Sequence, residues 1–373
     1  MKKFTVLFLF ASTVASAQPF GGIRTPNDTL QSIRILPGNN VVLSIYAPKA
    51  DTVSVMGDFL KEYKPLFLTK AANGVWSVTI SNVRPDLYTY DFTVDGARTF
   101  DQRNPVYKES ENGMSNLFEV PGEEDDYCAV KDVPHGKVET VWLHSSVLNK
   151  DVRMHVYTPP GYEKMKQKLP VLYLQHGGGD NDASWTTAGR ANFIIDNLLA
   201  AGKAKLFIIV MPMGHPTAGF HMQAGIESDA YYKILFNDIM PYVQSHYNVS
   251  DQRYDKAFSG LSMGGLQALN VAIFAPEKFG YVLPLSTGYF PQQLKDLEDN
   301  HADALKNPEI NKLKLFWIAM GGEKDIAYQN GKNVTAMFDK YGIKYQTAPT
   351  FAAGHTFITW RHNLYDFAQL LFK

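Results

Sequence analysis

The chain has little cysteine, because Cys128 is the only one among its 373 residues. A single cysteine cannot close a disulfide within the chain or supply a cage of thiolates, so disulfide-built folds and thiolate metal centres are excluded. The His-Glu-x-x-His pattern of zinc hydrolases is missing. The glycines at 177–179 have neither the Lys-Ser/Thr of a P-loop nor the spacing of a dinucleotide site. We therefore expect no metal and no cofactor.

Long runs of one charge are also missing. The 36 basic and 37 acidic residues nearly cancel and leave a formal net charge of −1. Binding to nucleic acid or to an acidic membrane surface usually depends on clustered basic side chains that attract the polyanion. The composition therefore predicts neither kind of partner.

The apolar run near the start, Phe4 to Phe10, is too short for a membrane span, which needs about 20 apolar residues. Ser12, Thr13 and Ser16 interrupt it. Two lysines precede the run and small residues follow it at 15–17, which is typical of a secretory signal. We expect residues 1–17 to be removed and the protein to be secreted or periplasmic.

The length favours two domains. Residues 18–32 are rich in Gly, Pro, Asn and Thr and predict an extended lead-in. Short alternating segments separated by turn signals follow and predict an all-β, immunoglobulin-like sandwich over 33–120. Its expected strands are Val41–Tyr46, Thr52–Met56, Gly74–Ile80, Leu87–Val94 and one ending near Phe118–Val120.

Residues 121–137 are polar and rich in turn residues, and we interpret them as a linker. Residues 138–373 then alternate strands with helical stretches, which predicts an α/β domain with a mostly parallel sheet covered on both faces. Expected strands are 140–144, 153–157, 171–174, 206–210, 281–285, 315–320 and 344–348, with helices at 193–200, 231–247, 264–274, 294–305, 331–341 and 359–372.

A nucleophile elbow is predicted within Ala257 to Gly265, where Ser262 stands between Gly260 and Gly264 directly after an apolar run. A turn from strand to helix this tight strains the serine backbone and leaves no room for a side chain at either glycine. The serine hydroxyl would stand at the carboxyl edge of the sheet. A serine elbow in the middle of a mostly parallel sheet predicts the α/β-hydrolase fold. The N–H of Met263, at the helix start, would be one oxyanion donor.

A serine nucleophile needs a histidine base, and three histidines follow Ser262. His301 falls in a helix with a solvated face, and His362 lies inside the last helix. His355 follows a strand and precedes that helix in a Gly-containing loop, which is where this fold places the base. We therefore predict His355 as the base.

The acid should come from the loop after the strand Leu315 to Met320, since the order in this fold is Ser, acid, His. That loop offers Glu323 and Asp325. Gly321 and Gly322 let it curl back over the sheet edge, which favours Asp325 at its tip. Glu323 is the alternative.

The second oxyanion donor should come from the glycines after the strand Val171 to Leu174. We choose Gly178, with Gly177 and Gly179 as alternatives, because glycine lets the backbone approach the substrate oxygen. We assign His176, which precedes them, a structural role because the base is already assigned.

The sandwich region resembles family 48 carbohydrate-binding modules over most of residues 33–120. Glucan-binding members carry a tryptophan shortly after a Gly-Asp-Phe sequence. In this chain that sequence is Gly57 to Phe59, and Leu60 to Tyr63 follow it without a tryptophan. The module is therefore expected either to bind sugar or to act as a packing partner that shapes the cleft. The matching segments are Val55–Phe59, Gly74–Trp76, Leu87–Phe92, Val94–Gly96 and Arg103–Pro105.

Residues 138–373 resemble the esterase D family, in particular carbohydrate esterase family 1, which includes feruloyl and acetylxylan esterases. The resemblance places nucleophile, acid and base on Ser262, Asp325 and His355. It implies hydrolysis of feruloyl or acetyl esters on plant xylan or xylo-oligosaccharides. The matching segments are Tyr157–Tyr162, His176–Gly179, Asp196–Ala200, Val210–Gly214, Pro241–Val243, Gly260–Gly265, Gly322–Asp325 and Gly354–Thr356.

Trp185, Trp360 and the loop Met213 to Gln223 are candidates to flank the acyl group, although both tryptophans fit a core role as well. Two other functions are considered. A siderophore esterase of the enterochelin type shares this fold and also has an extra amino-terminal domain. A non-catalytic carbohydrate-binding protein is the other alternative, against which the complete Ser, Asp and His set argues.

Overall fold

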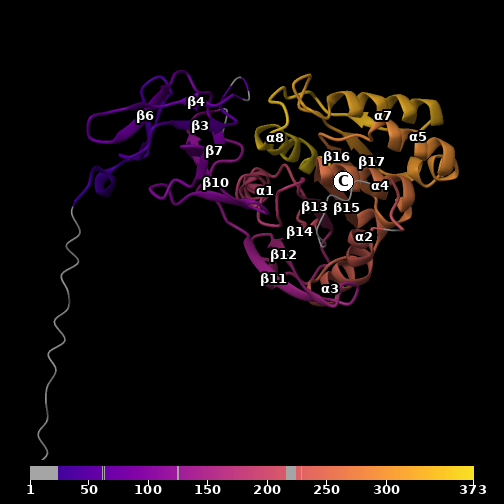
Figure 1. The fold of residues 1–373 in the computed structure, drawn as a ribbon. Coiled ribbons are helices and arrows are strands. Elements are labelled where there is room, and N and C mark those ends of the chain that lie inside the picture. Colours follow the sequence, from indigo (N-terminus) through magenta and orange to yellow (C-terminus); the bar gives the residue numbers. More distant parts are fainter. Residues whose placement is uncertain (1–23, 61, 63, 124–125, 216–223, 228) are drawn as a thin grey trace, which may run out of the picture.

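The computed structural model describes residues 24–373 except 61, 63, 124–125, 216–223 and 228 (Figure 1). The predicted signal, residues 1–17, lies outside the described residues. Strands between Ile33 and Val120 form two sheets on one side of the molecule, and the strands from Lys137 onward form a third sheet on the other. The chain is an α/β-hydrolase domain preceded by a small all-β sandwich, which confirms the predicted fold class.

The sandwich consists of two antiparallel sheets. One has the order β1-β2-β6-β5, and the other has the order β4-β3-β7-β10-β9 with β8 beside β7. Alternating side chains such as Val41, Leu43 and Phe92 meet between the sheets, as the period of two requires. The strands are β1 Ile33–Leu36, β2 Asn40–Tyr46, β3 Val53–Gly57, β4 Leu66–Phe67, β5 Thr69–Lys70, β6 Val75–Ile80, β7 Asp86–Val94, β8 Ala97–Thr99, β9 Tyr107–Ser110 and β10 Gly113–Val120.

The third sheet has the order β11-β12-β14-β13-β15-β16-β17-β18. The pairs β11–β12 and β12–β14 are antiparallel, whereas all later pairs are parallel, so the sheet is mostly parallel as predicted. The strand β15, which leads into the elbow, is central. The strands are β11 Lys137–Ser145, β12 Lys150–Thr158, β13 Val171–Gln175, β14 Ile208–Pro212, β15 Lys256–Leu261, β16 Tyr281–Leu285, β17 Leu315–Ile318 and β18 Gln346–Thr347.

Helices cover both faces of this sheet. Val171 and Tyr173 face the core shared with α2 to α7, whereas Leu172 and Leu174 face the core shared with α1 and α8. This explains why the central strands are apolar at every position. The helices are α1 Ala191–Ala200, α2 Ala230–Ile234, α3 Met240–His246, α4 Met263–Phe274, α5 Pro291–Asn300, α6 Ala302–Leu305, α7 Tyr328–Tyr341 and α8 Phe357–Ala368.

The helix expected over 231–247 is not regular. A π-helical segment, Leu235–Ile239, separates α2 from α3. Pro241 lies in the first turn of α3 and has no N–H, so the regular hydrogen-bond ladder is broken there and one wider turn accommodates the loss. The helix expected over 294–305 is likewise divided at His301.

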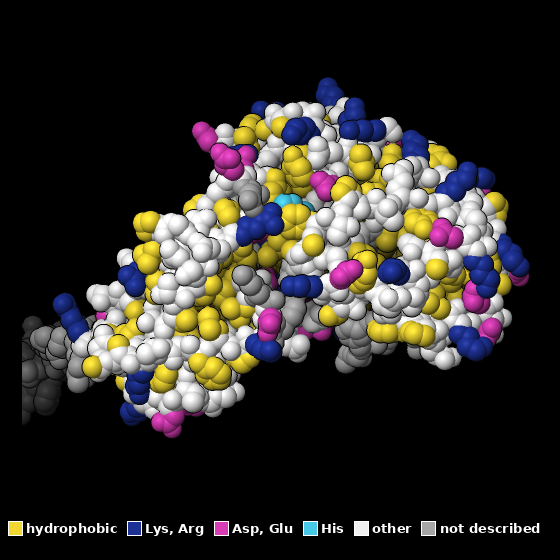
Figure 2. All heavy atoms as spheres, turned by 90° about the horizontal axis from the view of Figure 1, so that it is seen from above, with side chains coloured by type: hydrophobic (Ala, Val, Ile, Leu, Met, Phe, Trp, Pro, Cys, Tyr) yellow, Lys and Arg dark blue, Asp and Glu magenta, His cyan; other side chains and the backbone are white. Residues whose placement is uncertain are grey.

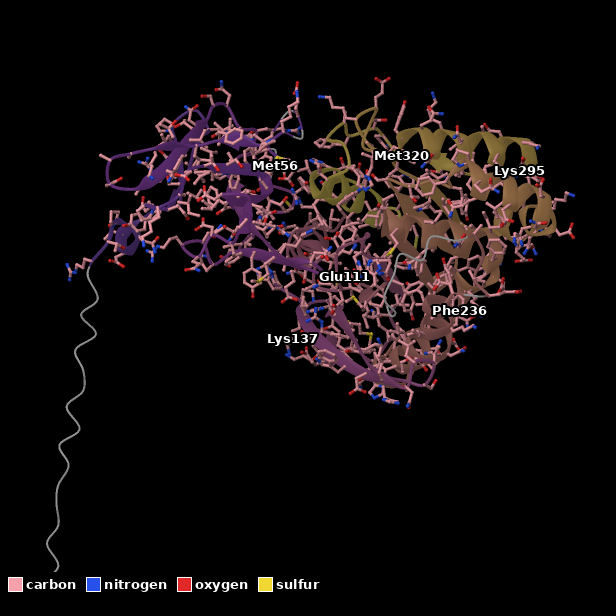
Figure 3. The ribbon with its side chains drawn as sticks, in the orientation of Figure 1. Met56, Glu111, Lys137, Phe236, Lys295 and Met320 are labelled. Atoms are coloured by element: carbon pink, nitrogen blue, oxygen red, sulfur yellow. The ribbon has the colours of Figure 1, made fainter. Side chains whose placement is uncertain are left out.

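Tyr127 to Ala129, within the segment predicted as a linker, pack against the α/β domain. Cys128 is fully buried, and the Asn197 side chain on α1 donates to the carbonyl oxygens of Tyr127 and Ala129. Figure 3 labels Glu111 where the β9–β10 hairpin meets the α/β domain. The N–H of Glu111 donates to the carbonyl oxygen of Gly179 at 3.0 Å. The two domains are therefore in direct contact.

Among the residues that the structure describes, none of the helices combines the length and the apolar character needed to cross a bilayer. The face shown in Figure 2 carries acidic and basic side chains intermingled rather than segregated. This agrees with the nearly balanced charge of the sequence.

Candidate active site

The elbow at Ser262 has the strained geometry expected from its sequence. Ser262 joins β15 to α4 with φ 76° and ψ −101°, which is rare for a residue with a side chain. A Cβ on Gly260 would lie 2.5 Å from the Gly264 carbonyl carbon, and one on Gly264 would lie 2.6 Å from the His176 oxygen. The predicted crowding at both glycines is therefore confirmed.

Three side chains from separate loops meet at this elbow. The Ser262 Oγ lies 2.9 Å from His355 Nε2, and His355 Nδ1 lies 2.7 Å from Asp325 Oδ1. An ionised carboxylate only accepts hydrogen bonds, so Nδ1 carries the proton and Nε2 of the neutral imidazole accepts from the serine hydroxyl. Glu323 is exposed in the same loop as Asp325. The fold thus brings Asp325 to the imidazole.

Asp325 is held in its ionised form. Burial alone would raise its pKa, but hydrogen bonds from His355, Ser286 and the Ala327 N–H outweigh burial and lower the pKa. The Gly321 N–H also donates to Oδ2 at 2.9 Å. The carboxylate therefore stays negative and oriented beside the imidazole, where it stabilises an imidazolium cation.

The predicted oxyanion donors are the backbone N–H groups of Met263 and Gly178. Met263 is the first residue of α4, so its N–H has no partner within the helix. Gly178 lines the cleft that contains His355. The alternative Gly177 is crowded, since an added Cβ would lie 2.5 Å from a Leu261 methyl group. Gly179 uses its carbonyl oxygen to accept from Glu111.

The His176 side chain holds this loop in place through two hydrogen bonds. Its Nδ1–H donates to the Gly177 carbonyl oxygen, and its Nε2 accepts from the Gly214 N–H, both at 2.8 Å. Burial lowers its pKa to about 4, so the ring is neutral at pH 7. This agrees with the predicted structural role.

The sequence analysis missed Ser286. It follows β16 directly, is fully buried and has a positive φ of 48°. Its Oγ accepts from Trp360 Nε1 at 2.9 Å and donates to Asp325. Its place at the carboxyl end of the strand next to β15 is the one signal that pointed to it, because functional groups of this fold gather at that edge.

The two tryptophans predicted beside the acyl group differ. Trp185 is 1% exposed, donates from Nε1 to the Gln175 carbonyl oxygen and packs against Phe357, so it belongs to the core and does not fit a substrate contact. Trp360 lines the cleft but is largely buried, with His355 edge-on at 5.0 Å between ring centroids. Most of the loop 213–223 lies outside the described residues.

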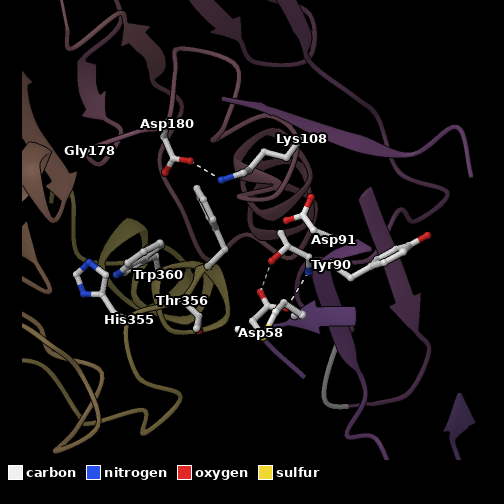
Figure 4. Close-up of a pocket in the computed structure, with 13 residues that line it drawn as sticks. Asp58, Tyr90, Asp91, Lys108, Gly178, Asp180, His355, Thr356 and Trp360 are labelled. Carbon is white, nitrogen blue, oxygen red and sulfur yellow. Dashed lines mark hydrogen bonds and ion pairs between the residues drawn. The ribbon is translucent and has the colours of Figure 1, made fainter. Parts of the chain in front are cut away.

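A cavity of about 350 Å³ beside His355 lies between the two domains. Figure 4 shows Lys108 of the sandwich meeting Asp180 of the α/β domain at its wall. The sandwich thus forms one side of the cleft. The lining residues are Met56, Gly57, Asp58, Thr89, Tyr90, Asp91 and Lys108 from the sandwich and Gly178, Asp180, His355, Thr356, Phe357 and Trp360 from the α/β domain.

A serine elbow after the central strand, an acid after a later strand and a histidine before the last helix define the serine-hydrolase class of α/β-hydrolases. The sequence model of the "Putative esterase" family matches residues 145–370, and that of carbohydrate-binding module 48 (isoamylase N-terminal domain) matches residues 29–107. The chain belongs to this esterase family, as the sequence resemblance indicated.

Known proteins match this chain over much of its length. An endo-1,4-β-xylanase/feruloyl esterase of Xylanibacter ruminicola is 33% identical over 82% of this chain, and the chain spans 41% of its length. A feruloyl esterase module from Clostridium thermocellum, solved with sinapinate, covers 72% of this chain and 94% of its own at 22% identity and TM-score 0.56. The latter likeness shows the fold.

The enterobactin esterase of Shigella flexneri, solved in the presence of enterobactin, covers 92% of this chain and 96% of its own length. Its TM-score is 0.68 at 16% identity. This likeness extends over both domains, whereas the feruloyl esterase structures cover 64–72% of the chain.

Proposed function

We propose that this protein is a serine esterase that removes feruloyl or related hydroxycinnamoyl groups from plant xylan or xylo-oligosaccharides. The observation that carries the proposal is the hydrogen-bonded chain from Ser262 through His355 to Asp325. The printed name of the Xylanibacter relative supports the substrate class. Acetyl groups are a further candidate, since one catalytic apparatus hydrolyses either ester and the cleft decides between them.

In the first step the Ser262 oxygen attacks the ester carbonyl carbon and His355 Nε2 takes the hydroxyl proton. The carbonyl oxygen becomes an oxyanion, to which the N–H groups of Met263 and Gly178 donate. The ester C–O bond then breaks, and His355 gives its proton to the departing sugar alkoxide. The product of this step is an acyl-enzyme on Ser262.

In the second step water attacks the acyl carbon while His355 takes its proton. The bond to the Ser262 oxygen breaks, and His355 returns the proton to the serine. Asp325 stabilises the imidazolium twice in the cycle and stays ionised throughout. The free acid and the deacylated sugar leave, and the enzyme is restored.

Replacing the nucleophile tests this proposal. We expect Ser262→Ala to lower release of ferulate from methyl ferulate by about 10⁴-fold or more, because the covalent step is lost. Ser245→Ala, an exposed serine on α3, is the matched control and should keep full activity. Circular dichroism checks that both variants fold. Ferulate release by Ser262→Ala at the wild-type rate would refute the proposal.

A siderophore esterase is the second candidate, favoured by the enterobactin esterase structure that matches both domains. Ferric enterobactin, methyl ferulate and acetylated xylan, incubated side by side with the protein, separate the candidates by which acid or fragment is released. We expect hydroxycinnamate release from xylan to exceed acetate release. Preferential cleavage of enterobactin would replace the proposal with the siderophore function.

Hydrolysis of a plant polymer requires the enzyme to reach it outside the cell, so we also propose that the protein is exported. The support is the predicted signal at residues 1–17, which lies outside the described residues. Amino-terminal sequencing of the protein from culture fluid or periplasm should begin at Gln18.

A further inference from the structure

The loop that carries His355 rests on the β-sandwich as well as on its own domain. Ile358, the second residue of α8, is 7% exposed and belongs to the hydrophobic core of the sandwich. It lines a cavity of about 390 Å³ together with Val83 and Tyr88 of that domain. Phe351, earlier in the loop, packs against the same core. The catalytic base is thus flanked on both sides in sequence by residues anchored in the sandwich.

A stack of side chains adds to this anchor. The Arg84 guanidinium of the sandwich lies over the Phe351 ring, 4.8 Å from its centroid. The other rings of the stack are His362 on α8, 3.6 Å from Phe351 between centroids, and Tyr127 of the connecting segment, 4.4 Å from His362. The loop is therefore tied to three other parts of the chain.

One buried ion pair fixes α8 against the sandwich. Arg361 is 1% exposed and donates through Nη2 to Asp86 Oδ1 at 2.5 Å and to the Leu87 carbonyl oxygen at 2.7 Å. Its Nη1 donates to the Ala188 carbonyl oxygen of the α/β domain. Separating a buried charge from its partners costs much free energy. A shift of α8 along β7 would therefore destabilise the folded protein strongly. In Figure 1, α8 lies on the side of the α/β domain that faces the sandwich.

The position of α8 in turn determines the geometry of the site. Trp360 on α8 contacts the His355 ring edge-on and donates to Ser286, which donates to Asp325. A displacement of α8 would therefore move the imidazole and disturb the hydrogen bonds of its acid partner. The base must lie within hydrogen-bond reach of Ser262 to take its proton.

We propose that the β-sandwich is a positioning element for catalysis: through Ile358, Phe351 and Arg361 it holds His355 in line with Ser262. The inference rests on the esterase function proposed above and extends it to the role of the front domain. A domain that only binds sugar would leave the hydrolysis of small esters unchanged. A domain that positions the base is needed even for a substrate that contains no sugar.

The test compares two alanine substitutions that remove side chains of the same size from the same hydrophobic core. Ile358→Ala removes the side chain at the joint with the His355 loop, whereas Leu43→Ala removes a fully buried side chain on β2. Both are assayed in the full chain with 4-nitrophenyl acetate and methyl ferulate, at a temperature where circular dichroism shows them folded. Ile358→Val is the conservative variant.

We expect Ile358→Ala to lower kcat about tenfold with little change in KM, since a displacement of about 1 Å can cost up to about a hundredfold in rate. Leu43→Ala should retain kcat although its melting temperature falls, and Ile358→Val should recover most of the activity. Equal kcat losses in the two alanine variants, or none in Ile358→Ala, would overturn the inference. A wild-type chain inactive on both esters would instead refute the esterase function itself.

A second pair of variants changes exposed residues, so this test does not depend on whether a variant with a buried cavity folds. Arg84 is exposed, so Arg84→Ala cannot open a buried cavity, and Arg34→Ala on β1 is an equally exposed control in the same domain. We expect Arg84→Ala to lower kcat about threefold, the equivalent of losing one exposed cation–ring contact of ~0.7 kcal/mol, and Arg84→Lys to restore it. Unchanged kcat in Arg84→Ala would contradict the contribution of the stack.

Discussion

At the scale of single residues, the site depends on which side chains the loops place within hydrogen-bond distance of the His355 imidazole. Asp325 and Glu323 are two positions apart in a Gly-rich loop, and the sequence favours Asp325 without excluding Glu323. In the fold, Asp325 accepts from His355, while Glu323 is exposed. Ser286 shares the acid with His355 and belongs to the same network.

Asn in place of Asp325 is expected to lower kcat by about 10⁴-fold while the fold is retained, because the amide favours the wrong imidazole tautomer. Glu323→Gln is the matched control two residues away and should keep wild-type activity. Steady-state hydrolysis of methyl ferulate measures both. The opposite result would make Glu323 the acid.

At the scale of elements, an ion network ties the loop that contains Gly178 and Asp182 to its surroundings. Asp182, whose side chain is fully buried, accepts from Arg153 and His155 on β12, and Arg153 also pairs with Glu109 of the sandwich strand β9. Burial opposes ionisation of Asp182, but hydrogen bonds from His155 and Arg153 outweigh it and lower its pKa. The loop that carries Gly178 is therefore fixed at its far end by a charged group.

This network predicts a pH-dependent stability. Because the folded-state pKa of Asp182 is lowered, its contribution to stability is present above the unfolded pKa, near 3.9, and disappears as pH falls through the folded pKa. We expect Asp182→Asn to lower the free energy of unfolding by roughly 2 kcal/mol at pH 7, less than for a fully buried pair because Arg153 is partly exposed.

The stability difference between Asp182→Asn and wild type should shrink steadily as urea unfolding is repeated at lower pH. Asp151→Asn removes an exposed carboxylate from β12, the strand that carries Arg153 and His155, and should change stability little at any pH. A difference that stays constant down to acid pH would show that the charge of Asp182 does not stabilise the fold.

At the scale of the whole molecule, the two domains form one structure. The buried pair of Arg361 and Asp86 and the contacts of the β9–β10 hairpin join them. Between them in sequence, Tyr127 to Ala129 pack on the α/β domain.

We therefore expect wild-type protein to unfold in one calorimetric transition whose van't Hoff and calorimetric enthalpies agree. Asp86→Asn leaves Arg361 without its charged partner and should lower the melting temperature by several degrees or split the transition. Asp51→Asn, an exposed aspartate in the sandwich, serves as the control. Two separate transitions in the wild-type protein would show that the domains unfold independently.

The sequence predicted most of the fold because its signals are local. Alternation with a period of two identified the sandwich strands, and apolar runs separated by helical stretches identified the parallel sheet. The expected strand 281–285 has the bounds of β16. The strand expected over 344–348 is shorter in the structure, where β18 spans only Gln346–Thr347. The irregularity around Pro241 was not predicted, although the proline itself was a visible signal for it.

The sequence by itself determined where to expect the elbow, since a serine between two glycines after an apolar run fits the tight turn from strand to helix, and it ordered the acid and the base behind Ser262. Only the tertiary structure decided that Asp325 meets His355, that Ser286 supports that pair and that Trp185 belongs to the core. The contact between Arg361 and Asp86, 275 residues apart, was equally invisible in the sequence. The physical reason is that contacts between distant segments depend on how whole elements pack, which no local pattern of residues encodes.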